Sequence, residues 1–396
     1  MVIKIKAGQT EHNISRIEVI TMLVMALMIR PTYCTYISSL RTAFTLISLL
    51  FAVITIVLCT IENIKNYTIS YTTIIVFMWQ AVIVFSTLFN GENNASAVTN
   101  ALQKIALFQF VELQARRSYK DLMKGLFNII SIYCAVDVLL MIWTGKNGVF
   151  PELNYLTGTP LYFMNGKFDT SYLQVLWSML LVYHEKNRRM FKLKCAAAIV
   201  INLIVCSYVR CTTGILMSCI FWLVVLIPAI REFFLKPKRF VVFFIVANFL
   251  IVVAKITLNK SNLMAWISMV LGKSVTLTGR TDIYSMFFDV IKDNWILGYG
   301  MGNNRIYEFS GGSYANMQNA FLQSIVMSGI IGTALLTIVI LRNLKRIGSK
   351  ETIAILAAMV SFFFAAIIEI VFDSILFIII LAIGCYVPQN EKVGER

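Results

Sequence analysis

The chain has 396 residues, of which 58% are hydrophobic and 14% charged, and its mean hydropathy is +0.76. An ordinary soluble domain carries about 25% charged residues, so this composition excludes a water-soluble protein and predicts an integral membrane protein. The net charge of +15 does not indicate nucleic-acid binding, because the basic residues flank apolar segments instead of forming a separate patch. The eight cysteines lie in or beside apolar segments without metal-ligand spacing, so no disulfide framework, metal site or cofactor is predicted.

Apolar segments that are long enough to cross a bilayer recur along the whole chain. A spanning helix needs about 20 residues to cross about 30 Å of hydrocarbon. The first segment lacks a small-residue cleavage site, so no cleavable signal is predicted. Eleven segments qualify, and they predict an all-α, polytopic membrane protein: Ile17–Tyr36, Thr42–Thr60, Tyr71–Phe89, Gly125–Trp143, Ser171–His184, Cys195–Tyr208, Thr212–Ile230, Phe240–Thr257, Gln318–Leu341, Ile353–Phe372 and Ser374–Val387.

A twelfth candidate, Ala97–Glu112, is weakly apolar because it contains Gln103 and Lys104. Lysine and arginine clusters in short loops mark the cytoplasmic side of a membrane protein. The clusters that follow Glu112, His184 and other spans share one side with the amino terminus only if Ala97–Glu112 also crosses. The sequence therefore predicts twelve helices in one membrane domain over residues 1–396, with both termini inside and the weak helix facing protein.

Most of the 35 lysines and arginines then lie on the cytoplasmic side. The positive-inside rule accounts for these residues but not for the basic residues at the outer ends of the helices. Those are Arg30, Arg41, Lys146, Lys167, Arg210, Lys255, Lys260, Lys273, Arg280, Lys292 and Arg305.

Two outer loops are long, Thr144–Thr170 and the polar loop 258–317. Within the second, apolar residues repeat at helical spacing from Ile283 to Ile291, opposite Asp282 and other polar residues. This pattern predicts a short amphipathic helix that lies in the membrane interface.

Three features of the outer face are candidates for chemistry. Thr278-Gly279-Arg280 precedes the amphipathic helix, and an arginine at a helix start suits a phosphate, although a snorkelling arginine is the alternative. Arg210 is the only charged residue between Lys194 and Arg231, with a role as a headgroup anchor as its alternative. The run Gly298-Tyr299-Gly300-Met301-Gly302 follows no strand, which rejects a dinucleotide site and leaves either an anion-binding turn or a plain turn.

Neither histidine lies on the predicted outer face, since His12 and His184 are both cytoplasmic. An outer general base must then be a carboxylate or a weaker group. The candidates are Asp282, Asp289, Asp293, Glu308 and Asp373, and Glu369 is expected to be paired inside the bundle.

Residues Tyr208 to Gly332 resemble the superfamily of O-antigen ligases and Wzy-type polysaccharide polymerases. The motifs are Arg210 with Thr212 and Gly214, Thr278-Gly279-Arg280 with Ile283-Tyr284, Ile296-Leu297-Gly298-Tyr299-Gly300, and Gln318-Asn319-Ala320-Phe321-Leu322 leading to Gly329 and Gly332. The amino-terminal half matches only as a hydropathy profile.

The resemblance implies a multi-pass protein of the bacterial plasma membrane that transfers glycan from a polyprenyl-diphosphate-linked oligosaccharide on the outer face. Guanidinium groups could neutralise the diphosphate leaving group without a metal. The predicted catalytic residues are Arg210, Arg280, Asp282 and Glu308, and the predicted substrate-binding residues are Tyr284, Tyr299, Arg305, Gln318 and Asn319.

One residue departs from the family pattern. Ligases of the family usually have His-Asn where this chain has Gln318-Asn319, and glutamine cannot take a proton at neutral pH. This difference favours a polymerase over a ligase. The remaining alternative is a lipid-linked oligosaccharide flippase, although the charges here lie at helix ends and not near the midplane, where a transporter needs them. Membrane lipids, a flippase and a chain-length regulator are the expected partners.

Overall fold

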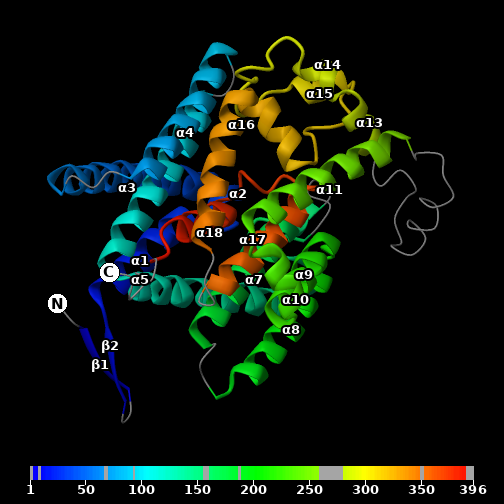
Figure 1. Ribbon diagram of the computed structural model, residues 1–396. Helices are drawn as coiled ribbons and strands as arrows, with labels where there is room; N and C mark the ends of the chain where they lie inside the picture. The colour runs from blue at the N-terminus through cyan, green and yellow to red at the C-terminus, as the bar shows by residue number, and fades with distance from the viewer. Residues whose placement is uncertain are drawn as a thin grey trace, which may run out of the picture.

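The fold is known from a computed structural model, which describes residues 3–7, 10–66, 70–91, 94–154, 160–185, 189–257, 280–347 and 352–388. Residues 258–279, which include Thr278 and Gly279 of the predicted phosphate motif, lie outside the described residues. The amino terminus forms an antiparallel hairpin of β1 (Ile3–Ala7) and β2 (Thr10–Ile14). In Figure 1 this hairpin projects from the helical body at the lower left.

Helices make up the rest of the body. In the first half they are α1 (Arg16–Met28), α2 (Tyr33–Tyr36), α3 (Ser38–Lys65), α4 (Tyr71–Phe89), α5 (Asn94–Thr144) and α7 (Lys167–Glu185), with the short 3-10 helices η1 (Gly145–Asn147) and η2 (Pro151–Leu153). In the second half they are α8 (Phe191–Tyr208), α9 (Thr212–Leu226), α10 (Pro228–Phe234), α11 (Pro237–Thr257), α13 (Arg280–Ser285), α14 (Phe287–Ile291), α15 (Arg305–Phe309), α16 (Ala320–Arg346), α17 (Ile353–Ala366) and α18 (Ile375–Cys385).

Each of the twelve predicted apolar segments overlaps one of these helices. Within the described residues, five helices are long and apolar enough to cross a membrane, or six if α9 and α10, which bend by 100°, form one span. The chain is therefore a helical integral membrane protein. The apolar pattern identifies helices well because a helix in lipid must satisfy its backbone hydrogen bonds within itself.

The weak segment Ala97–Glu112 is the first part of α5, which runs on into the next predicted span past non-helical backbone at Ser118. Its side chains face protein, as predicted, because Lys104 and Glu112 are almost completely buried. Glu112 accepts hydrogen bonds from Thr73 and Tyr386 and is paired with Arg116, so its charge is satisfied inside the bundle.

Two short helices occupy the centre of the bundle (Figure 1). All of α17 except Phe364 is buried, and all of α18 except Ile375. With 14 and 11 residues they are only about 21 and 17 Å long. Each is shorter than the about 30 Å of hydrocarbon, so the residues that adjoin it would have to complete a crossing. Residues 367–374 connect the two helices, and four residues of this linker line the candidate site described below.

The described part of the predicted outer loop, residues 280–317, is a folded unit, which we call the outer unit. The predicted amphipathic helix is interrupted at Met286, which separates α13 from α14. Its apolar side chains Ile283, Phe287 and Val290 are buried in a separate core together with Val326 of α16. This face packs against protein, so the helix does not present it to the membrane interface. Phe288 and Trp295, which are 74% and 50% exposed, point outward instead.

Candidate functional site

A cavity of about 660 Å³ lies where the ends of several helices meet, and we call it the Arg210 cavity. Four segments that are distant in the sequence line it: the start of α7, the turn between α8 and α9, the residues before α16, and the α17–α18 linker. It brings together two basic side chains, Lys167 and Arg210, with three acidic ones, Asp169, Glu369 and Asp373. Such a mixture of charges can bind an anion and also hydrogen-bond to hydroxyl groups.

Arg210 occupies a backbone position that normally favours glycine. It has a φ of 53°, in the left-handed region. Its N–H donates to Ser207 O at 3.0 Å, and the N–H of Cys211 donates to Cys206 O at 2.9 Å. These two bonds form a Schellman motif that ends α8, with Arg210 where glycine is usual. The left-handed conformation costs a non-glycine residue about 1–2 kcal/mol, so Arg210 carries backbone strain that glycine would not.

Gln318 is the second residue of this kind, with a φ of 46°. Its carbonyl accepts a hydrogen bond from the hydroxyl of Tyr284 at 3.2 Å, and Tyr284 is 1% exposed. The left-handed turn at Gln318 leads the chain from the outer unit into α16. Gln318 lines the Arg210 cavity, whereas Tyr284 supports the turn from behind.

Asn319 is buried and acts within the protein. Its side-chain oxygen accepts from the N–H groups of Phe321 and Leu322 and caps α16. Its amide donates to Ile367 O at 2.9 Å and to Asn248 at 2.7 Å. Asn319 therefore joins the start of α16 to the α17–α18 linker, and it is not among the residues that line the cavity.

Two acidic residues of the cavity, Asp373 and Glu369, interact with other side chains of the protein. Asp373 forms an ion pair with Lys104 of α5, which is 3% exposed and lies 5.9 Å from the ring centroid of Trp79. Glu369 accepts a hydrogen bond from Thr213 at 3.4 Å. The sequence singled out Asp373 and Glu369, but nothing in it joined Lys104 to Asp373, because the two residues are 269 positions apart. Two charges in apolar segments are the signal that could have suggested the pair.

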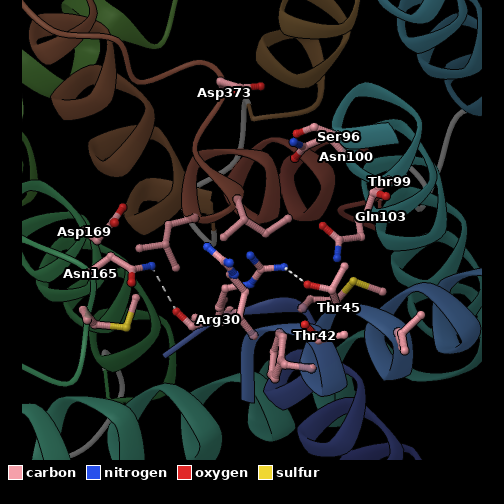
Figure 2. A pocket seen from close by; sticks show the side chains of 18 of the residues that line it. Arg30, Thr42, Thr45, Ser96, Thr99, Asn100, Gln103, Asn165, Asp169 and Asp373 are labelled. Atoms are coloured by element: carbon pink, nitrogen blue, oxygen red, sulfur yellow. Dashed lines mark hydrogen bonds between the residues drawn. The ribbon is translucent and has the colours of Figure 1, made fainter. Parts of the chain in front are cut away.

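A second cavity, of about 550 Å³, adjoins the first and is called here the Arg30 cavity. Figure 2 shows it, with Arg30 near its centre and Asp169 and Asp373 at its edge. Both acidic residues also line the Arg210 cavity, so the two cavities meet there. Arg30 and Lys167 are among the basic residues predicted at the outer helix ends, but the sequence assigned them to no site and gave no signal for Asp169.

Two further predicted residues, Arg305 and Glu308, do not line the Arg210 cavity. Arg305 and Glu308 of α15 are exposed and face each other at 3.7 Å. The guanidinium of Arg305 stacks over Tyr299 at 5.0 Å from the ring centroid. Burial raises the pKa of the Tyr299 phenol, and the charge of Arg305 partly offsets that rise. Arg280 begins α13, but its side chain and that of Asp282 lie outside the described residues.

The glycine-rich run packs against a break in α16. The N–H groups of Tyr299 and Gly300 donate to the carbonyls of Val326 and Met327 at 2.8 and 2.9 Å. That of Met301 donates to Thr87 at 2.9 Å. Gly329, with a φ of 59°, interrupts α16 beside this turn. Since these N–H groups already have partners in the protein, the run is a structural turn and not an anion cradle.

The fold and the site define a helical membrane protein with two connected, charged cavities at the ends of its helices. Residues 195–337 match the family model described as O-antigen ligase, so this section of the chain is similar to that family. The match confirms the resemblance found from the motifs between Arg210 and Gly332. Members of the family are membrane glycosyltransferase-like enzymes that act on lipid-linked oligosaccharides. No match is found among curated proteins or among solved structures.

Proposed function

We propose that the protein is a glycosyltransferase that polymerises polyprenyl-diphosphate-linked oligosaccharides into a surface polysaccharide, with the donor bound in the Arg210 cavity. The observation that carries this proposal is the strained, exposed Arg210 at the mouth of a charged cavity. Backbone strain of this kind is concentrated at functional sites. The residue also lies in the section that matches the O-antigen ligase family.

Arg210 also lines a shallow groove along the surface of α8, separate from both cavities. This groove also includes Lys146, Tyr208 and the apolar Ile204, which is 61% exposed. The polyprenyl chain of a donor could lie along exposed α8 in the lipid, while its diphosphate meets Arg210 and Lys146. The saccharide would then enter the polar cavity on the other side of Arg210.

In the proposed reaction a hydroxyl oxygen of the acceptor sugar attacks the anomeric carbon of the donor sugar. The bond from that carbon to the diphosphate oxygen breaks, and the electron pair leaves with the diphosphate. Arg210 and Lys167 stabilise this developing charge. The hydroxyl proton passes to a carboxylate where the two cavities meet, and we propose Asp373, which the sequence also singled out as a candidate base.

The remaining sequence predictions stay part of the proposal. Arg280 and Asp282 are proposed to approach the donor from the start of α13, and Arg305 and Glu308 to contact the growing glycan at the exposed surface of α15. The twelve-helix topology, with both termini in the cytoplasm of a bacterium and the site outside, is also proposed. A flippase and a chain-length regulator are the proposed protein partners.

A ligase that transfers the glycan to another acceptor is the second candidate, since the matched family is named for that activity. The glutamine at position 318 favours the polymerase, because the histidine usual in ligases is replaced. A flippase has no support from the family match.

The test is Arg210→Ala in a host that lacks the native protein, with the amount in the membrane measured by immunoblot. We expect loss of long polysaccharide and accumulation of single lipid-linked repeats, and partial activity for Arg210→Lys. The control is Arg189→Ala, at an exposed arginine before the opposite end of α8, which should leave chain length unchanged. Long chains of normal amount in Arg210→Ala would refute the proposal. Accumulation of long lipid-linked chains would instead favour a ligase.

A further inference from the structure

The Arg30 cavity is built from parts of the chain that lie outside the matched family domain. It is formed by the turn after α1, the start of α3, the first part of α5, the start of α7, and the end of the α17–α18 linker with the start of α18. Figure 2 shows Arg30 reaching into it and Asn100 and Gln103 on its far wall. Its walls thus offer cationic and amide groups to one small volume.

The arginine side chain is held in place by neutral groups. Arg30 donates to the hydroxyl of Thr45 at 3.0 Å, and its guanidinium carbon lies 5.6 Å from the ring centroid of Phe44. Asn165 donates to Arg30 O at 3.3 Å. The side-chain oxygen of Asn165 is buried and has no hydrogen-bond partner. The cavity therefore has an oriented guanidinium and an unsatisfied acceptor within its walls.

The basic groups of this cavity differ from those at the other ends of the helices. There, Lys124 is paired with Glu18 at 2.8 Å and Lys194 with Glu185 at 2.9 Å. Among the described residues, Arg30 and Arg41 have no carboxylate within salt-bridge distance. Two arginines without acidic partners beside one cavity form a site for an anion such as a phosphate or a diphosphate.

The cavity also adjoins a surface that faces lipid. Leu46 of α3 lines it and is 62% exposed, and the neighbouring Ile47 and Leu50 are 53% and 62% exposed. The 18-residue apolar window of α3 is only 22% buried. An apolar chain attached to the bound phosphate could lie along this helix, as the donor chain is proposed to do along α8.

We infer that the Arg30 cavity binds the phosphate groups of a second lipid-linked saccharide, the acceptor. The inference rests on the proposed function. The two lipids would stand on opposite sides of Asp169 and Asp373, which line both cavities. The terminal sugar of the acceptor would meet the donor sugar at these carboxylates, which hydrogen-bond to sugar hydroxyls. An acceptor of the same chemical class as the donor makes the enzyme a polymerase.

The test measures how many molecules of undecaprenyl diphosphate, used as a sugar-free probe, bind to the purified full-length protein in detergent. We expect two per chain for the wild type, one for Arg41→Ala and one for Arg210→Ala. Arg30→Ala should also bind one, and Arg41→Ala, at an exposed position, serves if that half-buried variant does not fold. Arg189→Ala is the matched control and should bind two. In cells, Arg41→Ala should accumulate single lipid-linked repeats, whereas Arg41→Lys should retain chain growth.

Competition identifies the source of the bound phosphate. Sodium pyrophosphate should displace the probe from both sites, whereas phosphatidylglycerol at equal concentration should displace neither. Displacement from the Arg30 cavity by phosphatidylglycerol would overturn the inference in favour of a general site for anionic lipids. One bound probe, lost only in Arg210→Ala, would overturn the inference and leave the proposed function intact. If the wild type bound no probe, both the inference and the proposed function would be refuted.

Discussion

Arg210 and Gln318 line the same cavity, and among the described residues they are the two non-glycine residues with left-handed backbone. They are more than 100 positions apart and end different segments, α8 and the outer unit. Each brings a long polar side chain to a position where glycine would relieve strain. Backbone strain is concentrated at functional sites, so this coincidence supports the proposal that the cavity is the active site.

Replacement of Arg210 by glycine separates stability from activity. Relief of the left-handed conformation returns about 1–2 kcal/mol, and the greater freedom of glycine in the unfolded chain removes about 0.5–1 kcal/mol. We expect Arg210→Gly to unfold in detergent at the same temperature as the wild type or slightly above it, yet to make no long polysaccharide. A variant that kept activity would show that the guanidinium is dispensable.

Replacement of Gln318 by glycine should have a much smaller effect. The same strain is relieved, and no proton acceptor is lost, because glutamine is not a base at neutral pH. We expect polymer synthesis within about tenfold of the wild type, against a loss of at least about 100-fold for Arg210→Ala, which corresponds to about 3 kcal/mol of transition-state stabilisation. Initial rates in isolated membranes measure both. Equal losses would assign Gln318 a direct part in the reaction.

The ion pair of Lys104 with Asp373 predicts a rescue of folding without a rescue of activity. Asp373→Ala leaves a buried ammonium group, and such losses cost about 3–5 kcal/mol, so the amount in the membrane should fall. The double variant Lys104→Met with Asp373→Asn removes both charges and should restore that amount. It should still make no long chains if Asp373 accepts the proton. Recovered synthesis in the double variant would limit the pair to a structural role.

The break in α16 predicts a purely structural glycine at position 329. A Cβ atom there would lie 2.1 Å from Ile296 O, so Gly329→Ala should separate the outer unit from α16 and lower the thermal midpoint. Gly311 is the matched control, because its φ of 61° is close to the 59° of Gly329 but a Cβ atom there meets nothing within 4 Å. Gly311→Ala carries only the backbone strain of about 1–2 kcal/mol. Equal shifts in the two variants would contradict the packing at Gly329.

The sequence by itself determined where the helices lie, including the weak segment Ala97–Glu112. It also identified the similarity to the O-antigen ligase family through Arg210 and the motifs up to Gly332. These properties are local, since a membrane helix must be apolar and internally hydrogen-bonded over about 20 consecutive residues. The prediction that the apolar face of the amphipathic helix lies in the membrane interface was wrong, because Ile283 and Val290 pack against apolar side chains of the outer unit.

Only the tertiary structure decided which of the outer charges come together. It brought Asp169 and Asp373 between two cavities, paired Lys104 with Asp373, and left Arg30 and Arg41 beside the second cavity. It also gave the glycine-rich run a packing role against α16. These relationships join residues that are tens to hundreds of positions apart, and they depend on how helices pack and where they end. Hydropathy and local spacing do not determine how the helices pack or which helix ends come together.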